Sequence, residues 1–256
     1  MTEGTGVLQG RVAIVTGGSR GLGFAMAGGL ARAGASVVVA ARSADAVERA
    51  AAGLRASGAD AIGVVCDVRE ESSVASLVTA TVERHGRLDI LVNNAGINIR
   101  KAPDVLSMDE WREVIDTNLT SALLGARAAY PHMKAAGGGK IINLGSMFSR
   151  FGASYAAAYA ASKAGIVGLT KSLAVAWAPD DIQVNAILPG WIDTDLTRGS
   201  REQVPGLAER VVARTPAGRW GRPDDVAGIA VFLASDASDF ITGAAIPVDG
   251  GYSALG

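Results

Sequence analysis

Short, continuously apolar segments recur along the chain, and longer segments rich in alanine separate them. Parallel strands that are buried on both faces have this pattern, whereas strands with one exposed face alternate apolar and polar residues. We therefore predict strands at Val12–Thr16, Ser36–Ala40, Ala61–Cys66, Leu88–Asn93, Lys140–Leu144, Gln183–Leu188 and Ala245–Val248.

The longer segments between these strands are predicted to be helices, and several have residues typical of helix ends. Ser43 and Ser107 are suited to N-terminal caps, because a serine oxygen accepts a hydrogen bond from the first helical turn. Gly34 and Gly58 are suited to C-terminal caps, and Pro179 cannot continue the helix before it. The predicted helices are Gly21–Ala33, Ala44–Ser57, Glu70–His85, Met108–Lys134, Tyr155–Trp177 and Asp224–Ser235.

Strands and helices alternate along the chain. This order predicts an α/β fold, a Rossmann-type doubly wound parallel sheet of about seven strands with helices on both faces. The sequence contains neither a Pro/Gly/Ser-rich linker nor an internal repeat, so we predict a single domain over residues 1–256. The least regular stretch is 195–222, which has two prolines. Loop-length statistics favour a lid or substrate loop there over a plain surface excursion.

Composition and charge exclude several classes of function. The net charge is -1, which gives no basic footprint for nucleic acid. The single cysteine, Cys66, cannot form an internal disulfide and suits a reducing compartment. No apolar run reaches the about 18 residues of a membrane span, and the first residues lack the features of a signal peptide. We therefore expect a cytoplasmic protein. The two histidines, His85 and His132, have no metal-ligand spacing, so no metal site is predicted.

A glycine-rich loop follows the first predicted strand and opens the first predicted helix. Glycines allow a tight turn and close approach to a pyrophosphate, and a helix N-terminus offers N–H groups and a positive dipole. The spacing is Gly-x3-Gly-x-Gly rather than the commoner Gly-x-Gly-x-x-Gly. The predicted dinucleotide contacts in this loop are Gly17, Ser19, Arg20, Gly21, Leu22 and Gly23.

The end of the second predicted strand indicates which dinucleotide is bound. NAD sites place an acidic residue there to hold the ribose 2′-hydroxyl, but this chain has Ala41 followed by Arg42. Arg42 and Arg20 would together suit a 2′-phosphate, which guanidinium groups bind bidentately. We therefore predict NADP. NAD stays possible if Arg42 is a solvated loop cation and Asp45 serves the ribose.

Tyr159 and Lys163 have the spacing of an acid–base pair. Residues i and i+4 share one face of a helix, about 6 Å apart along its axis. An ammonium at ~4 Å supplies about 4 kcal/mol at an effective dielectric of 20, enough to lower the pKa of a tyrosine by about 3. We therefore expect Lys163 to make Tyr159 a usable acid and base near neutral pH. Ser146 ends an apolar run upstream and completes the predicted site.

These motifs occur together, in order, over nearly the whole chain, and the chain resembles the short-chain dehydrogenase/reductase family. The matching pieces are Thr16-Gly17-x3-Gly21-x-Gly23, Asp67-Val68, Asn93-Asn94-Ala95-Gly96, Asn118, Ser146, Tyr159-x3-Lys163, Pro189-Gly190 with Thr194, and Asp249-Gly250-Gly251.

The resemblance implies a role for each catalytic position. Tyr159 would be the general acid in reduction and the general base in oxidation. Ser146 would bind and orient the substrate oxygen. Lys163 would lower the pKa of Tyr159 and bind the nicotinamide ribose, and Asn118 would hold a water that links Lys163 to solvent.

The same resemblance implies further contacts to the cofactor. Asp67 and Val68 would flank the adenine, and the backbone of Ile192 with Thr194 would bind the carboxamide. The remaining implied contacts are Asn94, Ala95, Gly96, Pro189 and Gly190, which would line the cofactor cleft.

The substrate is less clearly indicated. The segment Arg214-Thr-Pro-Ala-Gly-Arg-Trp-Gly221 looks most like the sugar-acid branch of the family, with its gluconate 5-dehydrogenases and 2-deoxy-gluconate 3-dehydrogenases. Asn98, Arg100 and Arg150 could meet a polyol or carboxylate, or could be solvated surface groups. Met147, Phe148, Phe151 and Trp191 would instead suit a small cyclic or aliphatic ketone. A 3-oxoacyl-(acyl-carrier-protein) reductase is another alternative, although only scattered arginines are available to dock an acidic carrier.

Two further possibilities concern turnover and assembly. A non-catalytic NADP-binding sensor would have no need of the tyrosine–lysine pair, which argues against that reading. The resemblance implies a homotetramer, in which the helix after Tyr159 and the Met108–Lys134 helix pair across one two-fold axis. The segment 246–251 would contribute at another axis.

Overall fold

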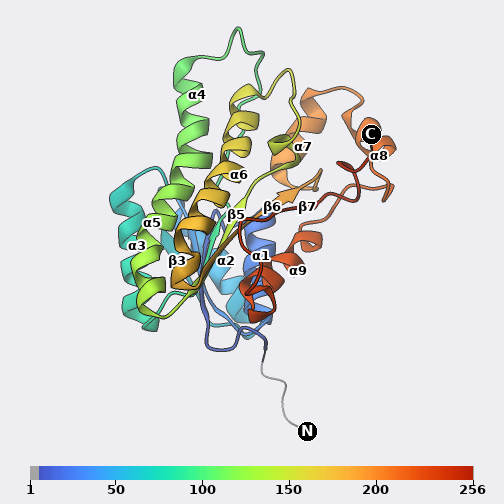
Figure 1. The fold of residues 1–256 in the computed structure, drawn as a ribbon. Helices are drawn as coiled ribbons and strands as arrows, with labels where there is room; N and C mark the ends of the chain where they lie inside the picture. Colours follow the sequence, from blue (N-terminus) through green and yellow to red (C-terminus); the bar gives the residue numbers. More distant parts are fainter. Residues whose placement is uncertain (1–5, 256) are drawn as a thin grey trace.

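Seven parallel strands form one sheet in the order β3-β2-β1-β4-β5-β6-β7. The structure is a computed structural model that describes residues 6–255, and Figure 1 shows the sheet between two layers of helices. The seven predicted strands are confirmed with shifts of one or two residues at their ends. Their bounds are β1 Val12–Thr16, β2 Ser36–Ala41, β3 Ala61–Val65, β4 Ile90–Asn93, β5 Gly139–Leu144, β6 Ile182–Pro189 and β7 Ala245–Val248.

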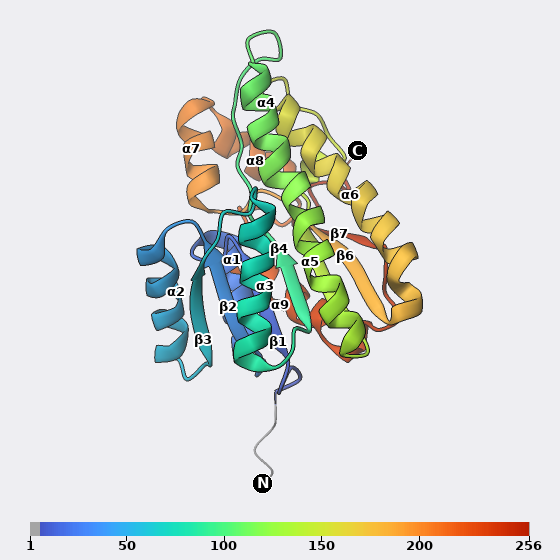
Figure 2. The same ribbon diagram turned by 90° about the vertical axis from the view of Figure 1, so that its left-hand side faces the viewer.

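The strands are apolar throughout because each one packs on both faces. In β1, Ala13 and Val15 belong to one hydrophobic cluster and Ile14 to another on the opposite face. The first cluster lies under α1 Gly21–Arg32, α2 Ala44–Ala56 and α9 Asp224–Ala234. The second lies under α3 Glu71–His85, α5 Ser121–Ala135 and α6 Ala157–Trp177, and Figure 2 shows these helices in front of the sheet.

The strand order reverses next to β1. The chain runs from β1 outward to β2 and β3 and then returns to β4 on the other side of β1. A doubly wound sheet has its binding crevice at such a point, outside the carboxyl ends of the strands. The Thr16 hydroxyl joins the two strands there, because it donates to the Val92 carbonyl at 3.2 Å and accepts from the Asn94 N–H at 3.1 Å.

The predicted helix Met108–Lys134 is not uniform. It divides into α4 Met108–Ile115, a π-helical turn at Asp116–Thr120, and α5. The backbone stays helical on both sides of the wide turn. Turns of this kind insert an extra residue into a helix and are frequent at functional sites. Here the turn contains Asn118, which is buried.

The stretch 195–222 is more regular than its sequence suggested. It forms α7 Asp195–Gln203 and α8 Leu207–Arg214. Figure 1 shows both helices away from the two helix layers, on the side where the carboxyl ends of the strands lie. Ser200 is the only buried residue of α7. The role of the stretch 195–222 as a lid stays a prediction. That residues 1–256 form a single domain also stays a prediction.

Residues 6–255 have neither a membrane-spanning helix nor a clustered set of metal ligands. In that part of the chain, no helix combines the length and the apolarity needed to cross a membrane. The same residues contain no group of three or more histidine, cysteine or acidic side chains placed to hold a metal ion.

Candidate active site

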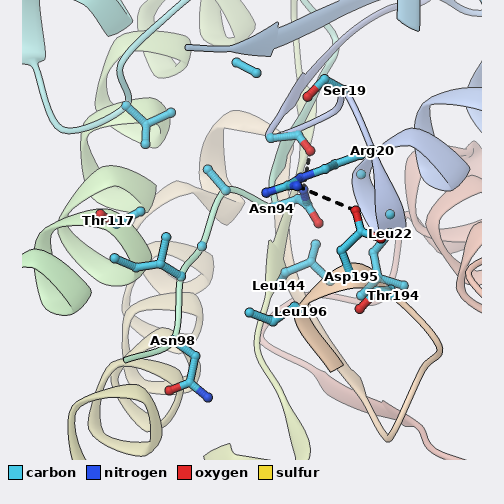
Figure 3. Close-up of a pocket in the computed structure, with 18 of the residues that line it drawn as sticks. Ser19, Arg20, Leu22, Asn94, Asn98, Thr117, Leu144, Thr194, Asp195 and Leu196 are labelled. Atoms are coloured by element: carbon cyan, nitrogen blue, oxygen red, sulfur yellow. Dashed lines mark hydrogen bonds and ion pairs between the residues drawn. The ribbon is translucent and has the colours of Figure 1, made fainter. Parts of the chain in front are cut away.

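A cleft of about 980 Å³ lies at the carboxyl ends of the strands, between the loop after β1 and α7. Figure 3 shows side chains from both sides of it. The structure brings together in this cleft every residue predicted to contact the cofactor, and Ser146 as well. These cofactor residues are Gly17, Ser19, Arg20, Gly21, Leu22, Gly23, Arg42, Asp67, Val68, Asn94, Ala95, Gly96, Tyr159, Lys163, Pro189, Gly190, Ile192 and Thr194.

The glycine-rich loop is held close to the loop after β4. A Cβ at Gly17 would lie 2.9 Å from the Ala95 Cα, and one at Gly23 would lie 2.4 Å from the Gly17 carbonyl oxygen. Gly17 and Gly21 also have φ values of 61° and 56°, which favour glycine. The Asn94 amide fixes the loop, since it donates to the carbonyl oxygens of Thr16 at 2.9 Å and Gly17 at 3.1 Å.

The amino end of α1 faces this cleft without a side-chain cap. Its first N–H groups are therefore available to an anion, and the helix dipole favours negative charge there. A space bounded by glycines beside an uncapped helix start fits a pyrophosphate, so the residues present suit a dinucleotide.

Arginines gather at the opposite, adenosine end of the cleft. Arg69 binds the Asp67 carboxylate at two points, 3.1 and 2.7 Å away, and this bond lowers the pKa of Asp67 to about 2. Arg49 and Arg69 also line the cleft. Neither residue belongs to a sequence motif, so neither was predicted to contact the cofactor. Arg20, by contrast, forms an ion pair with Asp195 at 3.5 Å, drawn in Figure 3.

Tyr159 and Lys163 lie on one face of α6, as predicted; Lys163 is buried, and Tyr159 is half-buried at the cleft wall. Burial raises the pKa of Tyr159, while the Ser146 hydrogen bond and the Arg100 charge act in the opposite direction. The expectation that Lys163 brings the pKa of Tyr159 near neutrality is therefore wrong for this structure, in which burial has the largest effect. The Lys163 ammonium donates to the Leu144 carbonyl at 2.7 Å and lies 5.6 Å from the Tyr159 ring centre.

Burial also changes Lys163 itself. It lowers the pKa of this ammonium from 10.5 to about 8. An isolated buried charge is costly, and among residues 6–255 the hydrogen-bond partner of Lys163 is a carbonyl oxygen rather than a carboxylate. A ligand that bears hydroxyl groups or negative charge would lower this cost.

Ser146 is positioned by the short helical turn that follows β5. Its hydroxyl accepts a hydrogen bond from the Phe148 N–H at 3.2 Å, and its own N–H donates to the Ser149 hydroxyl at 3.3 Å. Phe148 in turn packs edge-on against Tyr159, with ring centres 5.9 Å apart. The turn therefore fixes Ser146 and supports Tyr159.

Asn118 lies behind the cleft rather than in its lining. Its side chain accepts from the Ile97 N–H at 2.8 Å and donates to the Ile97 carbonyl at 2.9 Å and to the Ser162 hydroxyl at 3.0 Å. A Cβ at Gly96 would lie 3.2 Å from the Asn118 Oδ1 and 3.6 Å from the Lys163 Nζ. The predicted partners Asn118 and Lys163 thus approach the same small space, and the bridging water stays a prediction.

A cation and aromatic rings lie close to Tyr159, next to the residues that line the cleft. Arg100 is half-buried and donates to the Leu196 carbonyl of α7 at 2.9 Å. Burial lowers the pKa of Arg100, and the nearby Tyr155 and Tyr159 oppose that shift. Trp191 packs edge-on against Phe148, with ring centres 5.9 Å apart. The arrangement suits a ligand with an anionic group and an apolar body.

Comparison with known proteins gives consistent matches over the whole length. The family model described as enoyl-(acyl carrier protein) reductase matches residues 17–253. The chain is 45% identical to a cis-4-hydroxycyclohexanecarboxylate dehydrogenase of Sinomonas cyclohexanicum, over 96% of this chain and 97% of the relative. It is 40% identical to a 2-dehydro-3-deoxy-D-gluconate 5-dehydrogenase of Formosa agariphila, over 96% and 94%.

The fold is matched equally well. A crystal structure of a gluconate 5-dehydrogenase from Burkholderia cenocepacia, in complex with NADP and tartrate, superposes with a TM-score of 0.92. Its sequence identity is 40%, and the match covers 96% of each chain.

Proposed function

Because the chain belongs to the short-chain dehydrogenase/reductase family, we propose that it uses NADP to interconvert a secondary alcohol and a ketone on a hydroxy acid. A sugar acid or a related polyol is the first candidate. The observation that carries the proposal is the meeting of Ser146, Tyr159 and Lys163 in a cleft that fits a dinucleotide.

The residues of this chain would bind the substrate and move its proton. A bound nicotinamide supplies or accepts the hydride. In ketone reduction the Tyr159 hydroxyl gives its proton to the carbonyl oxygen, while the Ser146 hydroxyl donates a hydrogen bond to the same oxygen. In alcohol oxidation the proton returns to Tyr159. The Lys163 ammonium stabilises the tyrosinate that reduction leaves behind, and Asn118 would hold the water through which the proton is replaced.

Arg100 supports an acidic substrate. Its charge acts on Tyr159, so a carboxylate bound to Arg100 would lie near the reacting oxygen. A half-buried guanidinium binds a carboxylate with paired, charge-assisted hydrogen bonds. The two relatives described above are named for substrates that contain a carboxylate.

Two other substrates are supported by particular features. The rings of Phe148 and Trp191 beside Tyr159 favour a small cyclic hydroxy acid or ketone, and a relative 45% identical to this chain is named for such a ring acid. The name of the matching family favours an acyl-carrier-protein thioester instead. A non-catalytic NADP sensor is disfavoured by the assembled acid–base pair.

A substrate panel tests these assignments. We expect turnover with NADP for a sugar acid or a cyclic hydroxy acid. The Tyr159→Phe variant should have a kcat at least about a thousandfold lower, because the proton donor is removed. Arg100→Gln should lower kcat/KM for the acid by about tenfold or more, and that for a neutral alcohol of the same ring or chain much less.

The matched control is Arg150→Gln, which removes an exposed arginine from the turn after Ser146. Equal losses for acidic and neutral substrates in Arg100→Gln would contradict the carboxylate assignment. Turnover of acyl thioesters alone would favour the reductase alternative, and tight NADPH binding without turnover of any compound would favour the sensor.

Assembly and location complete the proposal. We expect a homotetramer in the cytoplasm. The outer face of α6 supports close pairing of helices, since Ala161, Ala164 and Gly168 are small and exposed. The edge strand β7 is half-exposed and leaves a second surface for a partner.

A further inference from the structure

Four arginines border the adenosine half of the cleft: Arg20, Arg42, Arg49 and Arg69. Two of them already have acidic partners. Arg69 holds Asp67 at two points, and Arg20 pairs with Asp195 across the cleft. Of the two arginines predicted to bind a 2′-phosphate, Arg20 is therefore engaged by Asp195, and Arg42 is left for the ligand.

Arg49 is placed to take the second position. It lies in the second turn of α2, on the same side as Ala46, and both line the cleft. Arg49 is six positions after Ser43, and six positions span about 9 Å along a helix axis. Side chains on a helix lean toward its amino end, so the Arg49 guanidinium leans toward Arg42 and Ser43.

Neither Arg42 nor Arg49 has a hydrogen-bond acceptor or an ion-pair partner among residues 6–255. Asp45 stands four residues before Arg49, at helical pairing distance, yet the two form no ion pair. The neighbouring carboxylate, Glu48, is bound to Arg55 instead. Both guanidinium groups thus keep all their N–H donors for a ligand.

We propose that Arg49 is a second binding residue for the ribose 2′-phosphate, acting with Arg42 and the Ser43 hydroxyl. Two guanidinium groups match the charge and the oxygen geometry of a phosphate monoester. The Ser43 oxygen accepts from the Ala46 N–H at 3.3 Å, which leaves its own proton free to donate. This inference rests on the proposed use of NADP and assigns the discrimination between NADP and NAD to α2.

The test is a binding titration of the full chain, read by calorimetry, which needs no turnover. NADPH, NADH and 2′,5′-ADP are titrated into the parent protein and into Arg49→Gln, Arg42→Gln and Arg84→Gln. Arg84 is an exposed arginine of α3 that does not line the cleft, so its variant controls for the loss of one charge. Arg49→Lys keeps the charge and removes the bidentate geometry.

We expect Arg49→Gln to weaken NADPH and 2′,5′-ADP by about tenfold or more, because a charge-assisted bond is lost, and to leave NADH unchanged. Arg42→Gln should behave similarly, Arg49→Lys should lie between, and Arg84→Gln should match the parent. If Arg49→Gln behaves like Arg84→Gln, Arg49 is a solvated surface cation and the inference is overturned while NADP use stands. Equal losses for NADPH and NADH overturn it too. A parent that binds NADH as well as NADPH overturns both this inference and the proposed cofactor.

Discussion

Burial shifts the pKa values of Tyr159 and Lys163 in opposite directions, and in both it favours the neutral form. It raises the pKa of Tyr159 and lowers that of Lys163 to about 8. The sequence-based prediction included the attraction between the Lys163 charge and a tyrosinate. It left out the cost of removing water from each charged group, which is the largest effect in the folded chain. A protonated Tyr159 suits the acid role in ketone reduction, and oxidation would depend on a ligand that restores charge to this site.

The pKa of Lys163 leads to a prediction about stability. The unfolded lysine titrates near 10.5 and the folded one near 8, so below pH 8 the folded chain carries a buried charge at full cost. Between pH 8 and 10.5 only the unfolded chain stays charged at this position, so the cost falls steadily and reaches zero near pH 10.5. We therefore expect Lys163→Met to raise the free energy of unfolding by up to about 3 kcal/mol at pH 7, and by progressively less as pH rises.

Urea unfolding at pH 7 and pH 10 measures this difference. Lys171→Met, on the exposed side of the same helix, serves as the control and should change little at either pH. A Lys163→Met variant that is destabilised by the same amount at both pH values would show that burial of the charge is not the dominant effect.

At the scale of elements, local sequence gave the type of each segment more reliably than its inner geometry. The segment from Met108 onward is helical as predicted, yet the sequence pattern did not predict the π-helical turn at Asp116–Thr120. The turn is stabilised by contacts to a distant loop, since Asn118 binds both backbone groups of Ile97. Such a contact depends on the packing of β4 against the helix and is invisible to local propensity.

This contact predicts a large cost for Asn118→Ala. The change leaves the N–H and the carbonyl of the half-buried Ile97 without their partner, and each unsatisfied group costs about 1–3 kcal/mol when water does not reach it. We expect the free energy of unfolding to fall by about 2–4 kcal/mol in urea titrations followed by circular dichroism.

Asn98→Ala is the matched control, because Asn98 lies on the same loop and its Oδ1 has no hydrogen-bond partner within the described part of the chain, residues 6–255. It should lose less than about 1 kcal/mol, since no made bond is removed. Similar losses in the two variants would mean that the bonds to Ile97 do not hold the π-helical turn.

At the scale of the whole molecule, the surface of the chain has exposed apolar side chains of the kind expected if it assembles. Phe240 is fully exposed just before β7, and Val175 on α6 is 80% exposed. Large exposed apolar side chains next to an edge strand and on a helix face are typical of surfaces that a partner covers.

Gly168→Glu tests the α6 surface without disturbing the protomer. A Cβ at Gly168 would meet no atom within 4 Å, so the change is tolerated within one chain, whereas a glutamate would block close pairing with a second helix. We expect light scattering to show a tetramer for the parent protein and a smaller species for the variant.

The control is Gly228→Glu on α9, where a Cβ would likewise meet nothing within 4 Å. It should leave the tetramer intact. A parent protein that is monomeric, or a Gly168→Glu variant that is as large as the parent, would overturn the tetramer and its pairing through α6.

The sequence by itself determined the strands, the helices that separate them, the phosphate loop and the shared face of Tyr159 and Lys163. These follow from periodicity, from backbone freedom at glycine and from helical spacing, all of which act between near neighbours. Only the tertiary structure decided which charges are paired and which stay available: Arg20 forms an ion pair with Asp195, whereas Arg49 lines the cleft and has no ion-pair partner among residues 6–255. The Arg20–Asp195 pair depends on the distance between two segments that are far apart in the chain, and burial in the folded chain sets the charge state of the catalytic pair.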